Sequence, residues 1–394
     1  MPQGVLLDGF IIRGGNANEP REDTQEQRHN RDGGGVLVEG DRVTVQNCIF
    51  EYNAAFRTGG GLVLAGDENI VKDCRFTNNI SQRNGGGLTL LANGSKVSCC
   101  VFERNHAAFG GGLDLGGHAS LAVDCRFIMN QAENGGAVFG GQDDSVSLLF
   151  CTFYNNRAAR CGGAWYQQYT RAMNAQNCLF VKNTADESGG AIHNHGYRGR
   201  AHLEGCGFIG NSAKYTGGAL SYKDGIINAV NCSFVDNGIS GDPRDQAIVG
   251  GIHQEVRDPN TESDTALILS NCILWGNTDH RHHGEQAQLQ ALNTQINNCC
   301  IQGWTGRLGG SENHGDDPMF IDLPGPDGIL GTPDDDLRLS PESPCIDRGD
   351  IKFLGPDVVD MDQDKDVTEP IPFDLGKKPR ILNGNVDVGA HESG

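Results

Sequence analysis

The chain has 394 residues, of which 57 are glycine, and its formal net charge is −20 at pH 7. It contains no run of 18 apolar residues, which excludes a membrane-spanning helix. Its acidic balance disfavours a nucleic-acid partner, because phosphate backbones are bound by clustered lysine and arginine. The charge is uneven: residues 316–374 hold 17 acidic and 4 basic residues. This segment is expected to attract cations.

The first residues of the chain read as the start of a repeat. Residues 1–7 contain neither a basic region nor a long apolar region, so no export signal is visible. Four positions match the next repeat, pairing Phe10, Ile12, Gly15 and Ala17 with Cys48, Phe50, Asn53 and Ala55. We therefore expect a first coil here, followed by an inserted polar loop at residues 18–32. Because an uncapped coil would expose a free edge, further residues are expected upstream in the natural precursor.

A Cys-x-Phe motif recurs through most of the chain. Its eight copies lie 25–28 residues apart, at Cys48–Phe50, Cys74–Phe76, Cys100–Phe102, Cys125–Phe127, Cys151–Phe153, Cys178–Phe180, Cys206–Phe208 and Cys232–Phe234. Cys272 and Cys300 continue the series after steps of 40 and 28 residues. A period of this length predicts the stacked coils of one solenoid.

Two further motifs accompany the copies. An asparagine stands three residues after each phenylalanine, and a glycine pair or triplet follows. Alternation predicts two short strands per coil, with Cys and Phe facing inward on one, and pairs such as Leu62/Leu64 and Ala137/Phe139 facing inward on the other. The asparagines are expected at bends, where left-handed backbone angles are tolerated and stacked amides hydrogen-bond along the axis.

Several of these motifs resemble a known superfamily. Gly189-Gly190-Ala191-Ile192, Gly217-Gly218-Ala219-Leu220 and the Phe-x-x-Asn sites resemble the repeats of polymorphic outer-membrane proteins, within the pectin-lyase-like right-handed β-helices. Segments 316–320, 337–349 and 387–392 are similar to the closing segment of large secreted planctomycete-type β-helix proteins.

The resemblance implies an all-β, single-stranded right-handed parallel β-helix of about ten to eleven coils over residues 1–315. An irregular acidic C-terminal cap is expected over residues 316–394. The resemblance is uninformative about chemistry, because lyases, hydrolases, adhesins and passive surface proteins share this fold.

The 14 cysteines are interpreted as mostly buried thiols. Neighbouring coils hold equivalent residues about 4.8 Å apart, whereas the Cβ atoms of a disulfide lie about 3.8 Å apart. Cys99 and Cys299, next to members of the column, and Cys161, at a glycine corner, are exceptions whose redox state stays open. No Cys-x-x-Cys pair indicates a zinc site.

The acidic segment contains two candidate calcium sites. In the first, alternating carboxylates are able to converge on a hard cation: Asp360, Asp362, Asp364, Asp366 and Glu369. It departs from an EF-hand, since Lys365 replaces the turn glycine and Ile371 the closing glutamate. The second comprises Asp327, Asp334 and Asp336, with Asp335 between them. A solvated acidic loop without metal is the alternative for both.

Between residues 165 and 257 the coils depart from the glycine-and-aliphatic pattern. Alignment on the glycine pairs places Gln168, His195 and Lys223 in one column, and Gln167, Asn194, Tyr222 and Glu255 in the next. The catalytic candidates are His195, Lys223 and Arg198, as base and carboxylate-neutralising cation of a polysaccharide lyase. The candidate ligand-binding residues are Trp165, Tyr166, Tyr169, His193, Tyr197, Arg200, Tyr222 and Glu255. Aromatic rings suit sugar faces, but longer polar turns without function are an alternative.

Two functions remain open from the sequence. The first is an extracellular or cell-surface protein with a rigid face that binds carbohydrate or a surface component. The second is a calcium-dependent polysaccharide lyase or glycoside hydrolase on the same scaffold. The cluster His280-Arg281-His282-His283 is expected to form an exposed loop rather than a zinc site, because adjacent histidines cannot all face one metal. The oligomeric state is not predicted.

Overall fold

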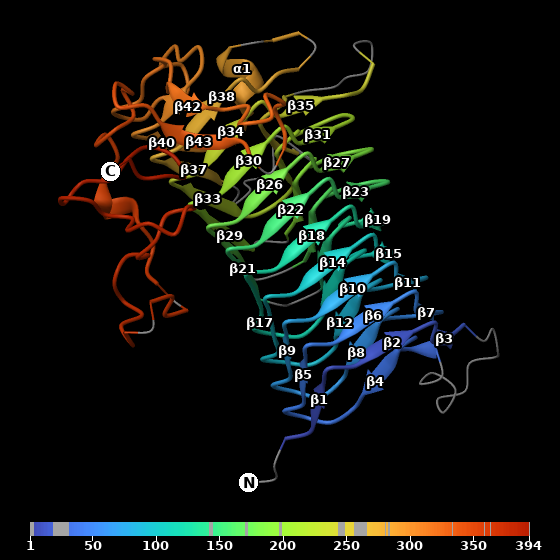
Figure 1. The fold of residues 1–394 in the computed structure, drawn as a ribbon. Coiled ribbons are helices and arrows are strands. Elements are labelled where there is room, and N and C mark those ends of the chain that lie inside the picture. Colours follow the sequence, from blue (N-terminus) through green and yellow to red (C-terminus); the bar gives the residue numbers. More distant parts are fainter. Residues whose placement is uncertain are drawn as a thin grey trace.

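The computed structural model describes residues 4–18, 31–141, 145–169, 172–196, 199–242, 249–255, 266–279, 281–282, 284–332, 334–357, 359–362 and 364–393. These residues form an elongated solenoid of parallel strands, with the C-terminal segment folded back along one side (Figure 1). Most of the predicted inserted loop at residues 18–32 lies outside the described residues. In the described part of the chain, no helix is both long and apolar enough to cross a membrane.

Sheet A contains 11 parallel strands. They are β1 (Leu6–Asp8), β5 (Thr44–Gln46), β9 (Ile70–Lys72), β13 (Lys96–Ser98), β17 (Ser120–Val123), β21 (Ser145–Leu149), β25 (Ala172–Gln176), β29 (Arg200–Glu204), β33 (Ile226–Val230), β37 (Ala266–Ser270) and β40 (Thr294–Asn297). Val45, Val71 and Val97 stand in register and are buried. The prediction of two strands per coil missed this sheet, because only three residues per coil alternate in its first strands and no marker residue recurs beside them.

Sheet B also contains 11 strands and carries the phenylalanine column. They are β2 (Ile11–Arg13), β6 (Ile49–Glu51), β10 (Arg75–Thr77), β14 (Val101–Glu103), β18 (Arg126–Ile128), β22 (Thr152–Tyr154), β26 (Leu179–Val181), β30 (Gly207–Ile209), β34 (Ser233–Val235), β38 (Ile273–Trp275) and β41 (Cys300–Ile301). Phe153 stacks on Phe127 and Phe180 with ring centroids 4.8 and 4.6 Å apart, and all three are fully buried. The predicted inward column is confirmed.

Sheet C contains nine short strands that follow the asparagine column. They are β3 (Asn16–Ala17), β7 (Ala54–Ala55), β11 (Ile80–Ser81), β15 (His106–Phe109), β19 (Gln131–Asn134), β23 (Arg157–Ala158), β27 (Thr184–Ala185), β31 (Ser212–Ala213) and β35 (Gly238–Ile239). Asn79 Nδ2 donates to Asn105 Oδ1 at 3.0 Å, as predicted. The predicted left-handed angle at the asparagines is wrong: the preceding residue has the positive φ, for example 52° at Arg104.

Sheet D contains ten strands. They are β4 (Val36–Val38), β8 (Leu62–Leu64), β12 (Leu88–Leu90), β16 (Leu113–Leu115), β20 (Val138–Gly140), β24 (Trp165–Gln168), β28 (Ile192–His195), β32 (Leu220–Tyr222), β36 (Ile252–Gln254) and β39 (Leu289–Gln290). Leu62 and Leu64 face the core, as predicted, but Phe139 does not. Val138 pairs with Leu113, so Phe139 takes the outward register of Asp114.

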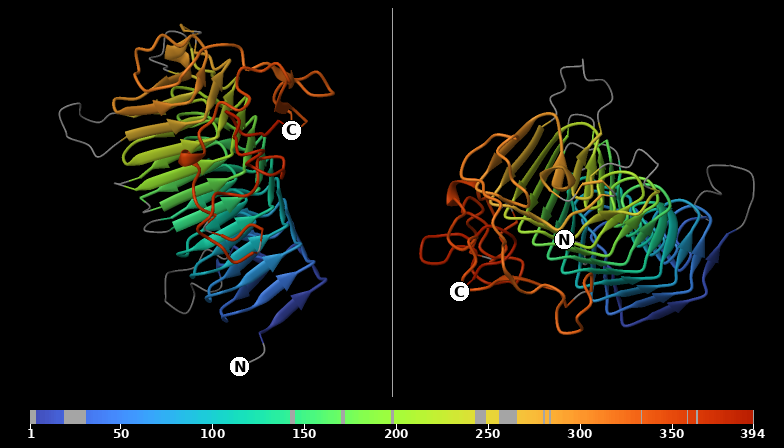
Figure 2. Two further views of the ribbon diagram at one scale, coloured as in Figure 1. Left: turned by 90° about the vertical axis from the view of Figure 1, so that its left-hand side faces the viewer. Right: turned by 90° about the horizontal axis from the view of Figure 1, so that it is seen from above.

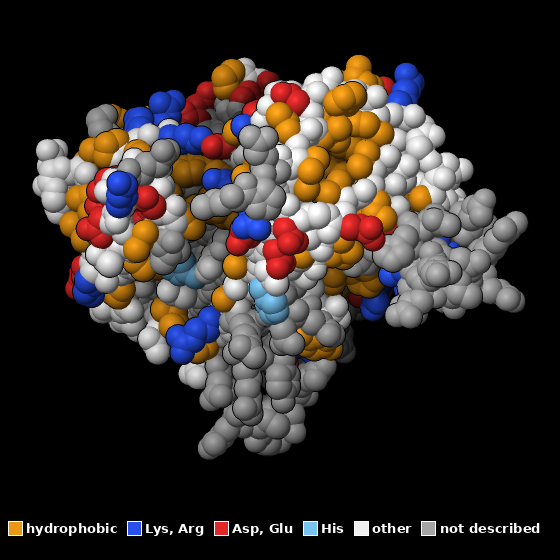
Figure 3. Space-filling view, turned by 90° about the horizontal axis from the view of Figure 1, so that it is seen from below, with side chains coloured by type: hydrophobic (Ala, Val, Ile, Leu, Met, Phe, Trp, Pro, Cys, Tyr) orange, Lys and Arg blue, Asp and Glu red, His pale blue; other side chains and the backbone are white. Residues whose placement is uncertain are grey.

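Nine coils, β1 to β36, have a strand in all four sheets, and two incomplete coils follow. The prediction of ten to eleven coils counted these partial turns. The first coil aligns as predicted, with Ile12 opposite Phe50 and Ala17 opposite Ala55. At this end of the rod, apolar side chains gather on the surface (Figure 3), and Val5, Leu6, Phe10 and Ile11 are exposed.

The cysteine column is buried and its members are free thiols, as predicted. The three cysteines whose redox state stayed open, Cys99, Cys161 and Cys299, are free thiols as well. Cys99 is exposed and Cys161 is partly exposed. One assignment is corrected: Cys299 rather than Cys300 continues the inward column. Its Sγ accepts from Cys272 N at 3.4 Å, and Cys300 pairs with Ile273 on the outer face of sheet B.

The C-terminal segment runs back beside the solenoid rather than only covering its end (Figure 2). It contains the antiparallel pair β42 (Phe320–Asp322) and β43 (Asp336–Leu339) and the 3₁₀ turn η3 (Ile351–Phe353). The one α-helix of the described residues, α1 (Glu285–Gln288), lies before it. Leu337 packs on Val181, Ile209 and Val235, which are the outward residues of sheet B.

Backbone contacts and a buried ion pair hold this segment in place. Gly389 N donates to Asn271 O at 2.8 Å, and Gly355 N donates to the Glu204 carboxylate at 2.9 Å. Arg380 is fully buried and donates to Glu392 at 2.9 Å. Burial raises the pKa of Glu392 to about 8, although the Arg380 guanidinium opposes this shift.

Candidate functional site

A depression of about 390 Å³ lies on the outer side of sheet D. One wall comes from strands β24 and β28 and from the residues that follow β32 and β36. The opposite wall comes from the corners between sheets C and D. The lining residues are Phe109, Asn134, Arg160, Cys161, Tyr166, Gln168, Glu187, Ser188, His193, His195, Lys223 and Glu255. We call this depression the D groove.

The floor of the D groove is a row of flat side chains. Phe109, Phe139, Tyr166 and His193 follow one another with ring centroids 5.0, 6.0 and 5.4 Å apart. Parallel pairing of the sheet D strands puts Phe139, Tyr166 and His193 in one outward column. Gly189, with φ 69°, leaves room for the row, because a Cβ there would lie 2.9 Å from His193 Cβ.

At one end of the D groove, the Glu255 carboxylate contacts several polar groups. Glu255 lies 3.8 Å from His193 Nδ1 and 3.9 Å from Lys223 Nζ, and it accepts from Ser221 Oγ at 3.1 Å. Burial opposes ionisation of Glu255, but His193, Ser221 and Lys223 lower its pKa overall. Burial lowers the pKa of His193 to about 4, so its imidazole is neutral at pH 7 beside an anionic carboxylate.

The opposite wall carries a second pair of opposite charges. Arg160 Nε lies 3.2 Å from Glu187 Oε1, and the Cys161 thiol lies 3.6 Å from Glu187 Oε2. Burial and the nearby Glu187 charge raise the pKa of Cys161 to about 12. A thiol held neutral in this way is a poor nucleophile.

The predicted aromatic patch divides into an outer and an inner set. Tyr166 lines the D groove, where its OH lies 3.3 Å from His195 Nδ1, and Tyr169 borders the groove by packing against His195. Trp165 and Tyr222 instead belong to the core and are fully buried. The prediction that Trp165 and Tyr222 meet a ligand is therefore corrected, because alternation turns them inward.

The remaining predicted residues are spread along the coil. Arg200 is exposed, but it lies on sheet A, away from the lining of the D groove. Tyr197 and Arg198 lie outside the described residues. Among the catalytic candidates, His195 and Lys223 come together in the D groove.

The predicted columns are correct except for Glu255. Gln168 pairs with His195, and Asn194 with Tyr222, as expected. Tyr222 pairs with Gln254, however, so Glu255 follows His195 and Lys223 in the outward column. The misalignment arises because Val249, with φ 62°, occupies the left-handed corner position that Gly217 holds one coil earlier. The glycine pair at 250–251 thus stands one place later than in the other coils.

Three of the predicted calcium ligands come together. One carboxylate oxygen from each of Asp360, Asp362 and Asp364 lies within 4.8 Å of the others. A second group joins Asp362 and Glu369 to Asp357, which the sequence analysis missed. Asp357 is fully buried, and its Oδ1 and Glu369 Oε1 are buried without a hydrogen-bond partner in the structure.

Burial and neighbouring carboxylates raise the pKa values of Asp357 and Glu369. Both effects disfavour a second or third negative charge, and a bound cation would offset them. An oxygen-only donor set with an orphaned buried carboxylate oxygen fits Ca²⁺. The fit is better than the sequence alone indicated.

The other predicted ligands are engaged elsewhere. Asp336 makes a bidentate contact with Arg338, with distances of 2.9 and 3.0 Å to Nε. Asp327 Oδ1 accepts from Ile329 N, Asp334 accepts from Thr332, and Asp366 accepts from Thr368. These contacts are typical of loop-stabilising Asx turns. In the cluster at 280–283, His282 contacts Asp279 at 2.9 Å, while residues 280 and 283 lie outside the described part.

Comparison with protein families agrees with this architecture. The model of the right-handed β-helix region matches residues 7–131 and 34–255. The chain belongs to the right-handed β-helix family. A search of the curated proteins and a search of the solved structures give no match to this member of the family. The family therefore accounts for the solenoid and its handedness and leaves the chemistry of the D groove to its own residues.

Proposed function

We propose that this β-helix protein binds a carbohydrate chain in the D groove. The observation that carries the proposal is a groove in which Phe109, Tyr166 and His193 lie between walls of hydrogen-bonding and charged groups, with Phe139 continuing the ring row beneath them. Sugar rings offer apolar C–H faces and a rim of hydroxyl groups, so they suit aromatic surfaces bordered by polar side chains. The exposed edge of Tyr169, which is 39% accessible, extends this surface.

The direction of the groove supports a polymeric ligand. Its floor residues follow one another from coil to coil, so the row runs along the axis of the solenoid. The rise per coil is about 4.8 Å, which is similar to the length of one sugar unit in an extended chain. Successive units would therefore meet equivalent positions on successive coils.

The charges favour binding over catalysis. A lyase needs a cation that neutralises the substrate carboxylate and a base that removes the adjacent proton. Lys223 lies beside Glu255, and Arg160 lies beside Glu187, so both cations already have acidic partners. His193, with a pKa of about 4, is a weak base. A lyase or hydrolase at this groove is the second candidate, supported by the contact between the Tyr166 hydroxyl and His195.

We further infer that the C-terminal segment binds Ca²⁺ through Asp357, Asp360, Asp362, Asp364 and Glu369. Calcium bound there would neutralise mutually repelling carboxylates and brace the loop that contacts sheet A. Sites of this open kind in extracellular modules have dissociation constants of roughly 0.1–1 mM. A site of that strength is filled outside cells, which supports a secreted or cell-surface location.

Affinity electrophoresis through gels that contain pectin, alginate, xylan or a glycosaminoglycan tests the binding proposal. We expect retardation by at least one polysaccharide, and we expect Tyr169→Ala to weaken it about tenfold, which corresponds to about 1.4 kcal/mol. Tyr52→Ala is the matched control, because Tyr52 is 54% exposed and lies at the corner after β6, several coils away from the groove.

The same samples distinguish catalysis from binding. Unsaturated products that absorb in the ultraviolet, or new reducing ends, would establish the second candidate. Equal retardation of wild type and Tyr169→Ala, or retardation by none of a broad set of polysaccharides, would contradict the D groove as the carbohydrate site.

Thermal melts with calcium and with excess chelator test the metal proposal. A ligand at one hundred times its Kd stabilises the folded state by about 2.7 kcal/mol. Asp362→Asn should remove this difference, since Asp362 belongs to both carboxylate groups. Asp334→Asn, in the same segment but outside both groups, should retain it. Identical melting of the wild type under both conditions would contradict the calcium site.

A further inference from the structure

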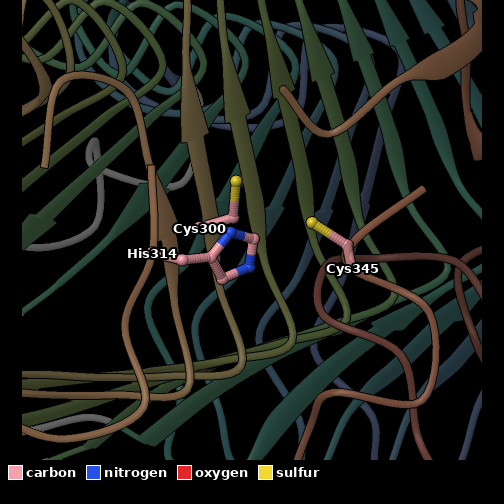
Figure 4. Close-up of side chains that lie close together, drawn as sticks. All are labelled: Cys300, His314 and Cys345. Atoms are coloured by element: carbon pink, nitrogen blue, oxygen red, sulfur yellow. The ribbon is translucent and has the colours of Figure 1, made fainter. Parts of the chain in front are cut away.

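A second cluster of potential metal ligands lies where the solenoid meets the C-terminal segment. Cys300, His314 and Cys345 come from three different parts of the chain and meet there (Figure 4). Cys300 is on β41, the last strand of sheet B, and His314 pairs beside it through a parallel bridge. Cys345 belongs to the returning segment, where Val388 N donates to Cys345 O at 2.9 Å.

The three side chains are close and shielded from solvent. Their ligand atoms lie within 4.8 Å of one another, and both cysteines are fully buried. Both ring nitrogens of His314 are buried and have no hydrogen-bond partner. An imidazole placed beside two thiols without satisfied nitrogens is costly, because a buried polar atom loses its contact with water.

The distances are close to those that a tetrahedral metal requires. Zinc lies about 2.3 Å from thiolate sulfur and about 2.0–2.1 Å from imidazole nitrogen, so neighbouring ligand atoms are about 3.4–3.8 Å apart. The present spacing, within 4.8 Å, is at most about 1 Å wider than this range. Two thiolates and one imidazole favour zinc over calcium or magnesium, which prefer oxygen.

We propose that Cys300, His314 and Cys345 bind one Zn²⁺ that fastens the C-terminal segment to the end of the solenoid. Binding releases the thiol protons of both cysteines and leaves two thiolates on the metal. The Asp316 carboxylate lies 3.5 Å from His314 Nδ1, close enough to accept a hydrogen bond from the ring and orient it once the metal is bound. The fourth coordination position is taken by water. The proposal is independent of carbohydrate binding.

The outward direction of Cys300 supports this role. Cys299 fills the inward thiol column, so Cys300 is not needed there. Cys300 instead contacts the small apolar cluster of Ile273, Leu339, Cys345 and Val388, which joins the solenoid to the returning segment. A metal at this position would connect both sides of the junction.

Metal analysis of the full chain tests the proposal. After purification with reductant and without chelator, followed by exchange into zinc-containing and then zinc-free buffer, we expect one tightly held zinc per chain. Co²⁺ in its place should give the absorption bands of tetrahedral thiolate coordination. Cys345→Ser and His314→Gln should each lower zinc affinity by at least a hundredfold, and Asp316→Asn by roughly tenfold.

Cys161→Ser is the matched control, because Cys161 is a partly exposed thiol outside the cluster. It should keep one zinc per chain with unchanged affinity. His314→Gln leaves all thiols in place and His314 is only partly buried, so a folded variant is available even if Cys345→Ser does not fold.

Three results would overturn the proposal. They are less than a tenth of a zinc per chain in the folded wild type, equal zinc affinity of His314→Gln and wild type, and a Cys300–Cys345 disulfide in metal-free protein isolated without reductant. The last result would make the junction covalent instead of metal-linked.

Discussion

The outer faces of sheets B and D differ although the same coils build both. On sheet B the outward column is polar at Glu51, Thr77 and Glu103 and apolar at Val181, Ile209 and Val235, where the C-terminal segment covers it. On sheet D the column turns aromatic and polar over the same coils, and only coil residues line its groove among the described residues. An apolar column thus marks where the chain covers itself. A mixed aromatic and polar column remains open to a ligand.

Removing the buried Arg380 guanidinium should have the largest effect on how well the C-terminal segment covers sheet B. Arg380→Leu would leave the Glu392 carboxyl and the Gly389 and Ala390 carbonyl oxygens without their buried donor, which costs about 3–5 kcal/mol. We expect the C-terminal segment to loosen and sheet B to become accessible, measured by denaturant melts and limited proteolysis. Arg338→Leu, which removes an exposed arginine of the same segment, should cost less than about 1 kcal/mol. Equal losses for both variants would contradict the role of the buried pair.

The phenylalanine column should stabilise the core that lies beneath sheets B and D alike. Phe153→Ala removes a fully buried ring from the middle of the rod and should lower the free energy of unfolding by roughly 3–5 kcal/mol. The reason is lost burial together with the cavity that remains. A loss below about 1 kcal/mol in urea melts would show that this side chain is not packed inside.

A charged substitution should destabilise the covered face of sheet B more than the uncovered part of the same sheet. Val181→Asp would bury a carboxylate under Leu337 and cost roughly 2–4 kcal/mol. Thr77→Asp, at the equivalent position of an uncovered coil, should cost less than about 1 kcal/mol, which arises from repulsion by Glu51 and Glu103. Thermal melts of both variants measure the difference. Equal effects would mean that the segment does not cover Val181 in solution.

A buried histidine on sheet D should make the protein sensitive to acid. His253 pairs with Ser221 in the outward column that continues from His193. Burial lowers the pKa of His253 to about 4, whereas an unfolded histidine has a pKa of about 6.5. The unfolded state therefore binds more protons between these values, so stability is lost as the pH falls from about 6.5 to 4. The loss at pH 5 is about 2 kcal/mol for this residue.

His253→Gln should remove that part of the pH dependence, measured as unfolding free energies at pH 7 and pH 5. His118→Gln is the control, because His118 is exposed at a turn. An unchanged difference between pH 7 and pH 5 in His253→Gln would contradict burial of a neutral imidazole.

Most of the solenoid could be predicted because each coil repeats the same pattern of buried residues and bends. The buried phenylalanines, the hydrogen-bonded asparagines and the cysteine column recur at a nearly constant period, and each repetition supports the others. The same regularity caused the errors. Alignment on glycine failed where Val249 adopts the left-handed angle, and the paired cysteines at 299–300 left the inward residue ambiguous.

The candidate sites could be predicted only in part. His195 and Lys223 come together as the column alignment indicated, and Tyr166 and His193, which were named only as nearby candidates, line the same groove. The inward direction of Trp165 depends on its register within β24, which composition does not reveal. The docking of residues 337–390 on sheet B, and with it the Cys300–His314–Cys345 cluster, joins segments without any common period. Such contacts leave no repeat in the sequence.

Photo-crosslinking of a bound oligosaccharide tests most directly whether carbohydrate binds in the D groove. A probe derived from the polysaccharide that retards the protein is crosslinked, and the labelled residues are located by mass spectrometry. We predict crosslinks at Arg160, Tyr169, His195 and Lys223, and we predict that excess unlabelled oligosaccharide abolishes these crosslinks. Labels concentrated on the outer face of sheet B or on the C-terminal segment, with none around the D groove, would contradict it.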